Sequence, residues 1–337
     1  MDPLVSVVIT TYNLGWCIED TLRCVFAQTY KNIEIIVVDD ASTDDTPVRM
    51  APFLGRVKYI RHPTNQGAAM QAEGGPARNT GIRQAVGEFI ALLDGDDLWE
   101  PEKLAVQVDA ARRFPHAGLI VVDGVSFAHQ DGVILRSSLL HDYGDTFCSS
   151  LPEDSVVAID LYYRFLQGCM IDTPSQVMVP THVFRAIGVF DPCRADDYDF
   201  WIRVVAKFDV VLVKRRLVRY RCHATSLSGP LDRQFFHYTP INITIWKKHL
   251  RYCRPDSGPF VRRQIKKTLM KASERACEEG QLGDKAWASH FLWGLLKKNL
   301  WSPGFPYVAL SLTRLWCPQW VASTLRPLTR RILRRME

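Results

Sequence analysis

The sequence predicts an α/β protein with a mostly parallel sheet flanked by helices, followed by a helical C-terminal extension. Short β-rich apolar runs alternate with helical patterns over residues 1–125, and this order is typical of a parallel sheet with helical crossovers. The composition supports a packed core, because 47% of the residues are hydrophobic and 11% are aromatic. At 337 residues, the chain has room for one large domain with an appendage or for two ordinary domains.

The elements of the first part follow from local periodicity. Helices are expected around Ile18–Phe26, where apolar residues recur at helical spacing, and over Pro76–Val86, which opens on a proline and stops before a glycine. A third amphipathic helix is expected over Pro101–Phe114. Short runs rich in β-branched residues predict strands at Val5–Thr10, Ile33–Val38, Val57–Arg61, Glu88–Leu93 and Leu119–Val122.

The pattern weakens over Ser126–Leu151, where polar residues and glycine increase and only a hairpin at Asp131-Gly132 is expected. Further along the chain, the sequence predicts helices at Val156–Gln167, His182–Ile187 and Tyr198–Ala206, and strands at Ser175–Val179 and Val210–Lys214. The remainder after Pro230 is expected to be mainly helical.

The charge balance divides the chain near Pro230. Residues 231–337 hold 20 basic and 7 acidic residues, a net charge of +13, while residues 1–230 hold 22 and 29, a net charge of −7. Six of the nine tryptophans also lie in the basic part. We therefore expect one domain over residues 1–230 and a separate basic, tryptophan-rich helical region over residues 231–337.

Several classes of protein are excluded by what the sequence lacks. The nine cysteines form no CxxC pair and no compact Cys/His spacing, so we expect buried reduced thiols and no structural zinc site. The start MDPLVSVVITTYN has no signal-peptide pattern, and no run of about 18 apolar residues predicts a transmembrane helix. Glycines do not follow a strand at GxGxxG or GxxxxGK[ST] spacing, which argues against a dinucleotide or Walker-type ATP site.

Polar residues follow three of the predicted strands, where ligands bind in open α/β sheets. They are residues 10–13 (TTYN), 39–42 (DDAS) and 94–97 (DGDD). Asp39 or Asp40 alone would fit a helix cap, but three polar strand ends along one edge favour a binding site. The close carboxylates of residues 94–97 repel one another unless a cation or protons intervene, so they suit Mg²⁺ or Mn²⁺, although an isolated acidic turn would equally be a solvated loop.

An ordered set of six motifs makes the sequence resemble the inverting nucleotide-sugar glycosyltransferases of family 2, which have the GT-A fold. The motifs are SVVITTYN, IEIIVVDDASTDDT, PARNTGI, FIALLDGDDLWEPEKL, ADDYDFWIRV and YRCHATSLS, and they frame residues 4–228. The resemblance implies a Rossmann-like GT-A domain, with a nucleotide-sugar part over about residues 1–125 and an acceptor part over about residues 126–230.

The resemblance also implies roles for the donor side of the site. Thr11 and Tyr12 would line the nucleobase pocket, Asp39 would hydrogen-bond the base, and Arg78 would lie near the nucleotide and donor sugar. Asp96, Asp94 and His223 match the metal residues of the family, with Asp96 expected as a direct ligand and Asp94 as a contact to the sugar or ribose. Asp97 is expected to contact these residues without binding the metal itself. A lone histidine such as His223 is more often a surface or core residue, and its YRCH context is what favours the metal or diphosphate.

On the acceptor side, Asp196 and Asp197 stand where the family usually has Glu-Asp. The resemblance makes Asp197 the catalytic base for the acceptor hydroxyl, while the Asp at position 196 leaves the division of roles between the neighbours open. Both acids could instead favour the helix macrodipole. A second departure is the stretch Ala68–Gly75, where the family generally has a shorter link, and its glycine content predicts a mobile loop that overhangs the donor.

The predicted function is inverting, metal-dependent transfer of a sugar from a nucleoside-diphosphate sugar, with UDP as the expected nucleotide, to a hydroxyl of a glycan or lipid-linked acceptor, as in polysaccharide biosynthesis. Mn²⁺ or Mg²⁺ is the expected cofactor. One alternative is a metal-dependent nucleotidyl or phosphoryl transferase, which explains Asp94 and Asp96 but not the ADDYDFW and YRCH segments. Another is a non-catalytic scaffold that binds a sugar nucleotide.

The basic C-terminal region invites two interpretations. Aromatic residues and arginines over Phe305–Arg335 suit a segment that lies on an anionic membrane, which predicts a cytoplasmic protein attached peripherally to the membrane. The tryptophans would equally pack this region onto the catalytic domain. No nucleic-acid-binding motif accompanies the positive charge, so no nucleic acid partner is expected.

Overall fold

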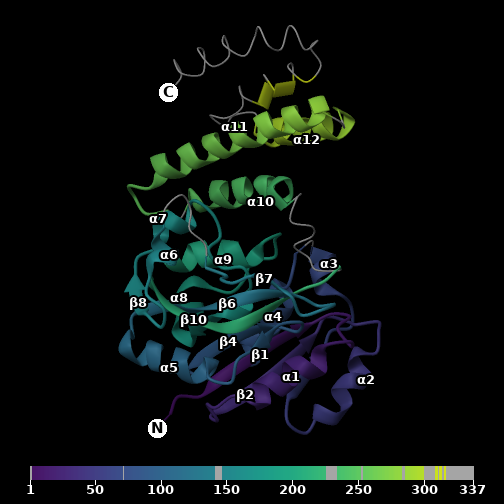
Figure 1. Cartoon of the computed structure of the whole chain (residues 1–337), viewed down its shortest axis with the longest axis vertical. Helices are drawn as coiled ribbons and strands as arrows, with labels where there is room; N and C mark the ends of the chain where they lie inside the picture. The colour runs from purple at the N-terminus through teal and green to yellow at the C-terminus, as the bar shows by residue number, and fades with distance from the viewer. Residues whose placement is uncertain are drawn as a thin grey trace. The chain divides into compact units, whose positions relative to one another are not determined.

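In the computed structural model, the chain forms two compact units, Met1–Gly229 and Pro230–Glu337 (Figure 1). It describes residues 2–70, 72–140, 146–224, 234–251, 253–282 and 285–299, together with residues 308, 309, 311, 312 and 315. Within these residues, the first unit contains a ten-stranded mixed sheet, and the second contains helices.

Four parallel strands form the half of the sheet that is nearest the N-terminus. Their order is β3-β2-β1-β4, and each neighbouring pair is parallel. The predicted strands of this half are confirmed, with bounds of Val5–Thr11 for β1, Ile33–Asp39 for β2, Lys58–Arg61 for β3 and Phe89–Asp94 for β4. Because the strands run the same way, their carboxyl ends lie at one edge of the sheet.

The second half of the sheet is mixed. A short antiparallel strand, β9 (Val177–Pro180), joins β4 to β6 (Ala117–Ala128), and β6 pairs in parallel with β10 (Asp209–Cys222). Both β6 and β10 are longer than the predicted strands. The sheet is completed by antiparallel partners, β5 (Leu98–Trp99) and β8 (Val156–Ile159) beside β10 and β7 (Ile134–Arg136) beside β6.

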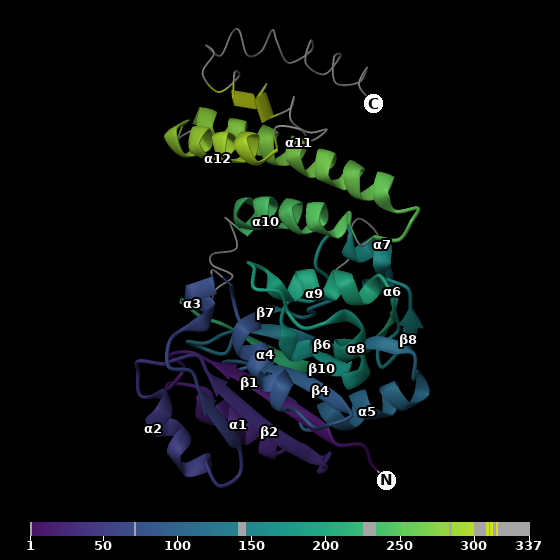
Figure 2. The same ribbon diagram turned by 180° about the vertical axis from the view of Figure 1, so that it is seen from behind.

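Alternate residues of the strands face two helical layers. Val7 of β1 belongs to a core that includes apolar residues of α1 (Ile18–Phe26) and α5 (Lys103–Arg113). Val38 of β2 instead packs with an alanine of α4 (Gly75–Gln84). Figures 1 and 2 show α9 (Asp196–Val205) on the same side of the sheet as α4. This alternation confirms the three predicted covering helices.

Further helices fill the connections of the first unit. They are α2 (Thr46–Met50), η1 (Ala51–Phe53), α3 (Gln66–Met70), α6 (Phe147–Ser150), α7 (Tyr162–Phe165), η2 (Pro174–Gln176), α8 (Thr181–Ile187) and α9 (Asp196–Val205). The helices predicted at His182–Ile187 and Tyr198–Ala206 are α8 and α9.

One predicted helix of the first unit was wrong, and one predicted strand is confirmed with a later start. The helix expected over Val156–Gln167 is a strand, β8, followed by the four-residue helix α7. The β-branched run at the start of this segment pairs with β10. The Asp160 carboxylate accepts the N–H of Tyr162, the first residue of the short helix, at 2.9 Å. The strand expected at Ser175–Val179 begins two residues later, because Thr173 and Gln176 form a capping box around η2.

The second unit is helical within its described residues, as predicted. Its helices are α10 (Gln234–His249), α11 (Gly258–Leu282) and α12 (Lys285–Lys298). Lys247 Nζ of α10 donates to the carbonyl of Lys298 at 2.9 Å and to Asn299 Oδ1 at 2.6 Å, which ties the first helix to the end of the third. Trp246 is buried and Trp293 is exposed, while the expected membrane segment Phe305–Arg335 lies almost entirely outside the described residues.

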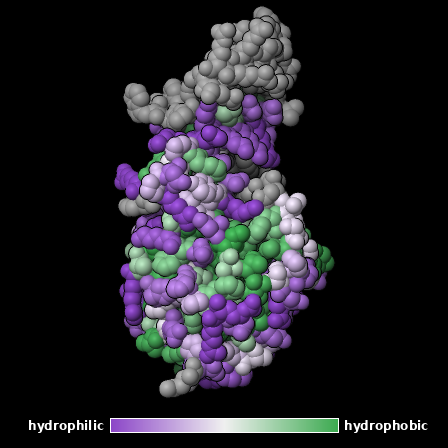
Figure 3. Space-filling view, turned by 90° about the vertical axis from the view of Figure 1, so that its left-hand side faces the viewer, coloured by the Kyte–Doolittle hydropathy of each residue, from purple (hydrophilic) through white to green (hydrophobic). Residues whose placement is uncertain are grey.

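The surface of the first unit is mixed, with apolar residues gathered near the middle of one face and polar residues around them (Figure 3). Three consecutive apolar side chains of the β6–β7 hairpin, Val133, Ile134 and Leu135, are each about half exposed. A bilayer-spanning helix needs about 20 apolar residues. No helix within the described part of the chain meets that requirement.

Candidate active site

The carboxyl ends of three parallel strands meet at one edge of the sheet and bring several predicted site residues together. The strand register pairs Thr11 of β1 with Asp39 of β2, and Thr10 of β1 with Asp94 of β4. The Thr10 hydroxyl also donates to Asp94 Oδ1 at 3.3 Å. Residues from three separate motifs therefore lie on adjacent strands.

Thr11 and Tyr12 leave polar and aromatic groups available at the end of β1. The Thr11 side chain is buried, and its hydroxyl has no hydrogen-bond partner among the described residues. Tyr12 is 45% exposed. A buried hydroxyl without a partner suits the polar edge of a ligand, and an exposed ring suits its flat face. The nucleobase pocket assigned to these residues stays a prediction.

Asp39 is fully buried, and both of its carboxylate oxygens are already engaged. Oδ1 accepts the Ser42 N–H at 2.7 Å, and Oδ2 accepts the Tyr59 hydroxyl at 2.6 Å. Burial and the bond to Asp39 raise the pKa of Tyr59, so this hydroxyl stays protonated as a donor. Each carboxylate oxygen can accept a second hydrogen bond, and the predicted contact of Asp39 with a base stays a prediction.

Asp40 has a different role from its neighbour. Its carboxylate accepts the backbone N–H groups of Gln66 at 2.8 Å and Gly67 at 2.9 Å, and it lies 2.6 Å from His62 Nδ1. Asp40 thus caps the short helix α3, which occupies the segment between the second motif and Arg78. That segment was expected to be a loop, and its first residues are helical instead.

Arg78 connects the donor side of the site to the acceptor side. It lies in α4 and is almost fully buried, with Nη2 2.9 Å from Asp94 Oδ1 and Nη1 3.1 Å from Asp196 Oδ1. Burial opposes its positive charge, but the carboxylates Asp94 and Asp196 outweigh that effect and raise the pKa of Arg78. Its Nε has no partner among the described residues, so one donor remains available.

Asp196 and Asp197 begin α9 but occupy different environments. Asp196 is fully buried, and besides Arg78 it accepts the Gly75 N–H at 2.7 Å. Burial raises its pKa to about 6 in spite of the attraction to Arg78. Asp197 is partly exposed and accepts the adjacent Tyr198 N–H at 2.6 Å, and its pKa is also raised by burial. Of this pair, Asp197 is the residue that is less deeply buried.

The acidic turn after β4 separates into an inner and an outer carboxylate. Asp97 is fully buried and accepts from the Thr173 and Ser175 hydroxyls at 2.7 and 2.6 Å and from the Arg221 N–H at 3.1 Å. Burial, with repulsion from Asp96 and Asp94, raises the pKa of Asp97 well above its ordinary range. Asp96 faces outward, and its Oδ2 lies 3.0 Å from His223 Nε2.

Comparison with known proteins identifies the family. A family model described as glycosyl transferase family 2 matches residues 6–143. The Escherichia coli protein WfgD, named as a UDP-Glc:α-D-GlcNAc-diphosphoundecaprenol β-1,3-glucosyltransferase, is 39% identical over 232 residues, which cover 68% of this chain and 81% of WfgD. The chain belongs to glycosyltransferase family 2. An uncharacterized glycosyltransferase of Rickettsia prowazekii is 27% identical over 248 residues, covering 73% of this chain and 72% of that protein.

Solved structures of glycosyltransferases share the fold. The crystal structure of S. aureus TarS residues 1–349 superposes with a TM-score of 0.60 at 17% identity, covering 96% of this chain and 91% of TarS. The mannosyltransferase PcManGT of Pyrobaculum calidifontis superposes with a TM-score of 0.55 at 18% identity, covering 94% and 88%. The predicted GT-A fold is confirmed, and the protein is a glycosyltransferase.

Two residues of this glycosyltransferase, Asp96 and His223, are close enough together to bind one divalent cation. Adjacent ligands of an octahedral ion lie about 3 Å apart when each metal–oxygen distance is about 2.0–2.1 Å, which suits the pair Asp96 and His223. Within the described residues, no group of three or more acidic, histidine or cysteine side chains is placed to hold a metal. The two residues would thus need phosphate oxygens of the donor as further ligands. Asp94 pairs with Arg78, which favours its expected role as a sugar or ribose contact.

Three residues near this pair were not predicted. The Trp16 ring, 43% exposed, lies 5.1 Å from the His223 ring and 4.4 Å from the His129 ring, measured between centroids. Arg221 Nε donates to the Asp96 carbonyl at 2.8 Å, and Nη1 lies 3.2 Å from His129 Nδ1. These residues come from three separate segments, so only the tertiary fold brings them together. The YRCH motif contains Arg221 and is the one sequence signal that points to it.

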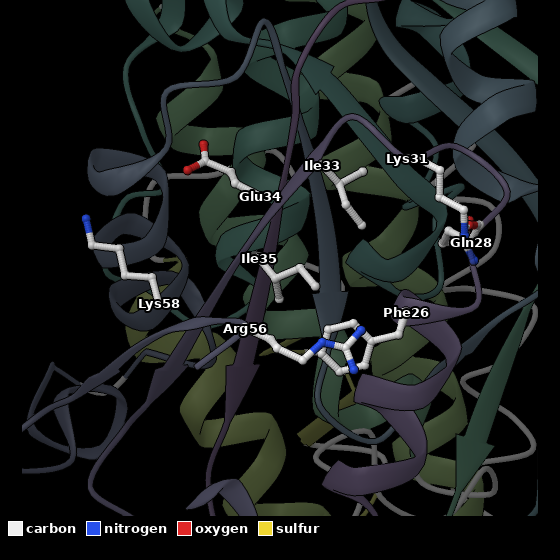
Figure 4. A pocket seen from close by; sticks show the side chains of 8 residues that line it. All are labelled: Phe26, Gln28, Lys31, Ile33, Glu34, Ile35, Arg56 and Lys58. Carbon is white, nitrogen blue, oxygen red and sulfur yellow. The ribbon is translucent and has the colours of Figure 1, made fainter. Parts of the chain in front are cut away.

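A surface hollow of about 470 Å³ lies at the opposite ends of the strands (Figure 4). Ile33 and Ile35 line it from the start of β2, and Lys58 lines it from the first residue of β3. The Arg56 guanidinium lies 3.6 Å above the Phe26 ring within it. The candidate active site is at the carboxyl ends of the same strands, so this hollow is separate from it.

Proposed function

We propose that this glycosyltransferase moves a sugar from a UDP-sugar to a hydroxyl of a lipid-linked glycan, with inversion at the anomeric carbon. The observation that carries the proposal is the position of Arg78, which joins Asp94 at the donor strand end to Asp196 at the start of α9. This connection supports the proposal because Asp197 directly follows Asp196 in α9. A one-step displacement requires a base that takes the proton of the acceptor hydroxyl while that oxygen attacks the anomeric carbon.

The choice of donor and acceptor rests on the relatives. WfgD and WfaP of E. coli, at 39% and 30% identity, are both named for UDP-Glc as donor and for α-D-GlcNAc-diphosphoundecaprenol as acceptor. TarS has been solved with UDP and with UDP-GlcNAc. UDP-glucose and a diphosphate-lipid-linked GlcNAc are therefore the first pair to test. The unpartnered Thr11 hydroxyl and the exposed Tyr12 ring supply surfaces for the uracil.

In the proposed mechanism, Asp197 accepts the proton of the acceptor hydroxyl as that oxygen attacks the anomeric carbon. Burial raises the pKa of Asp197, and a carboxylate with a raised pKa is a stronger base. The bond from the sugar to the diphosphate breaks, and UDP leaves. Arg78 favours negative charge on the donor, and its Nε–H has no partner among the residues that the structure describes. Asp96 and His223 would hold Mn²⁺ or Mg²⁺, which when bound neutralises charge on the diphosphate.

We also propose that the enzyme works at the cytoplasmic face of a membrane, attached peripherally. An undecaprenol-linked acceptor, as named for WfgD, is anchored in a bilayer. The net charge of +13 over residues 231–337 favours an anionic surface, because each basic residue near such a surface contributes about 1 kcal/mol.

The test is product analysis with purified enzyme, a panel of nucleotide sugars, Mn²⁺ or Mg²⁺, and the lipid-linked GlcNAc. The proposal expects free UDP and a glycosylated acceptor, with UDP release that depends on the acceptor. Release of pyrophosphate would indicate a nucleotidyl transferase. Binding of the donor without turnover on a broad panel of acceptors would indicate a scaffold instead.

A further inference from the structure

Arg221 is a buried arginine at the end of β10 that holds the acidic turn after β4 at two successive residues. It is 6% exposed. Its backbone N–H donates to Asp97 Oδ1 at 3.1 Å, and its Nε donates to the carbonyl oxygen of Asp96 at 2.8 Å. Arg221 therefore fixes both the inner carboxylate of the turn and the backbone of Asp96, which carries the outer carboxylate.

The same strand end leads to His223, the other residue of the candidate cation site. His223 directly follows β10, two residues after Arg221. Its Nε2 lies 3.0 Å from Asp96 Oδ2. Arg221 is thus joined to His223 through the backbone and to Asp96 through a hydrogen bond, so its position constrains the separation of these two side chains.

The guanidinium of Arg221 is itself held among aromatic and imidazole rings. Nη1 lies 3.2 Å from His129 Nδ1, and Cζ lies 5.2 Å from the centre of the Phe127 ring. Cζ also lies 5.6 Å from the centre of the Trp16 ring, which packs edge-on against the His223 ring. These contacts restrict the motion of the guanidinium and hence of the groups that it binds.

The positive charge of Arg221 does not by itself favour a cation at this site. Nη2 is buried without a hydrogen-bond partner among the described residues, and its ion pair with Asp20 is long, at 3.8 Å. Burial of a guanidinium without close pairing lowers stability, and a positive charge beside a cation site opposes the binding of the cation. The hydrogen bonds of Arg221, rather than its charge, are therefore the contribution that would favour a cation here.

We propose that Arg221 is a positioning residue that holds the Asp96 carboxylate and the His223 imidazole at the separation that one Mn²⁺ or Mg²⁺ ion requires. The inference rests on the proposed cation site. Ligands that are already in place lose little conformational freedom when an ion binds, so positioning them in advance strengthens binding. Loss of a residue that orients metal ligands typically weakens metal affinity by about 10–100-fold.

The test measures binding of Mn²⁺ to the full chain in the presence of saturating UDP, from the electron paramagnetic resonance signal of free Mn²⁺. The variant is Arg221→Met, which keeps a long side chain and removes the guanidinium donors. We expect the Kd for Mn²⁺ to rise by about 10–100-fold. Removal of a positive charge alone would lower this Kd, so positioning and electrostatics predict changes of opposite sign.

A second readout reports on the ligands of the bound ion. Electron spin-echo modulation from an imidazole nitrogen detects histidine bound to Mn²⁺, and His223→Gln is the reference without that ligand. We expect the nitrogen signal in the wild type and its loss in Arg221→Met saturated with Mn²⁺. A decrease in stability alone would not remove this signal from the folded protein.

The matched control is Arg219→Met, which removes the same charge two residues earlier in β10. The Arg219 guanidinium packs on the same Phe127 ring, with Cζ 4.9 Å from the ring centre. This variant should keep the wild-type Kd and the nitrogen signal. A Kd for Arg221→Met that equals or falls below the wild-type value, or an unchanged nitrogen signal, would overturn the proposal.

If methionine prevents folding, Arg221→Lys takes its place, because lysine keeps the charge but lacks the planar fork that reaches the Asp96 carbonyl and His129 together. A raised Kd in this variant supports the proposal, and an unchanged Kd contradicts it. A wild type that binds no Mn²⁺ with UDP present would remove the cation site and this inference with it. The assay needs no acceptor, so sugar transfer by an enzyme that fails it disproves this inference alone, while absence of transfer disproves the proposed function.

Discussion

Ionisation of Asp196 at neutral pH lowers the free energy of unfolding. Replacement of Asp196 by asparagine measures the size of this effect. Burial raises the pKa of Asp196 from 3.8 to about 6, although attraction to Arg78 opposes the shift. An acid whose pKa is raised on folding binds its proton more tightly in the folded state than in the unfolded state. The protonated Asp196 therefore contributes a stabilising free energy below pH 4, and this contribution is lost as the pH rises through 6. A shift of about two pKa units corresponds to about 3 kcal/mol.

Asp196→Asn removes the ionisable group and keeps an oxygen that can accept the Gly75 N–H. Arg78 keeps its second partner, Asp94, at 2.9 Å. We therefore expect the free energy of unfolding of the wild type to fall between pH 4 and pH 7 by about 3 kcal/mol more than that of the variant. For a unit of this size, that difference corresponds to about 6–12 °C in Tm.

The assay is urea unfolding of the full chain at steps from pH 4 to pH 7.5, followed by fluorescence and circular dichroism. Asp209→Asn, at an exposed aspartate of the same unit, is the control and should follow the wild type. Parallel pH dependence of the wild type and Asp196→Asn would refute the assigned burial of this charge and, with it, the reasoning that separates Asp196 from Asp197.

Three further predictions concern the reaction and the membrane. Asp197→Asn should keep UDP-sugar binding, measured by calorimetry, and lower kcat by about 10²–10⁴-fold, because an amide cannot accept the proton; a larger loss of kcat in Asp196→Asn at equal folded fraction would mean that the roles are reversed. Asp96→Ala should abolish turnover and weaken Mn²⁺ binding in the presence of UDP with little loss of stability, and full activity of the chelator-treated variant would contradict the cation site. Replacement of Arg330, Arg331, Arg334 and Arg335 by glutamine in the full chain should reduce co-sedimentation with anionic liposomes at low salt, and equal sedimentation of both proteins would remove the proposed role of this segment.

The strand ends of the site were predictable from the sequence because they depend on local pattern. Thr11, Asp39 and Asp94 each follow an apolar β-rich run, and parallel strands place such residues at one edge. The strand β8 was not predictable, because a short apolar run such as Val156–Ile159 fits a helix or a strand until its partner is known.

The different roles proposed for the acidic residues depend on tertiary packing. Asp196 and Asp197 are neighbours of the same type, and they differ because α4 covers one and leaves the other partly exposed. Trp16 is a single residue without a motif, so its contact with the His223 ring becomes visible only in the tertiary structure.

The anomeric configuration of the product decides whether the enzyme transfers the sugar with inversion. The wild-type enzyme is incubated with α-configured UDP-glucose and the lipid-linked GlcNAc, and the new linkage is assigned by the anomeric proton coupling in NMR. We expect a β-linked product formed together with one equivalent of UDP, because Asp197 activates the acceptor for a single displacement. An α-linked product, formed by the same enzyme at the same site, would contradict it.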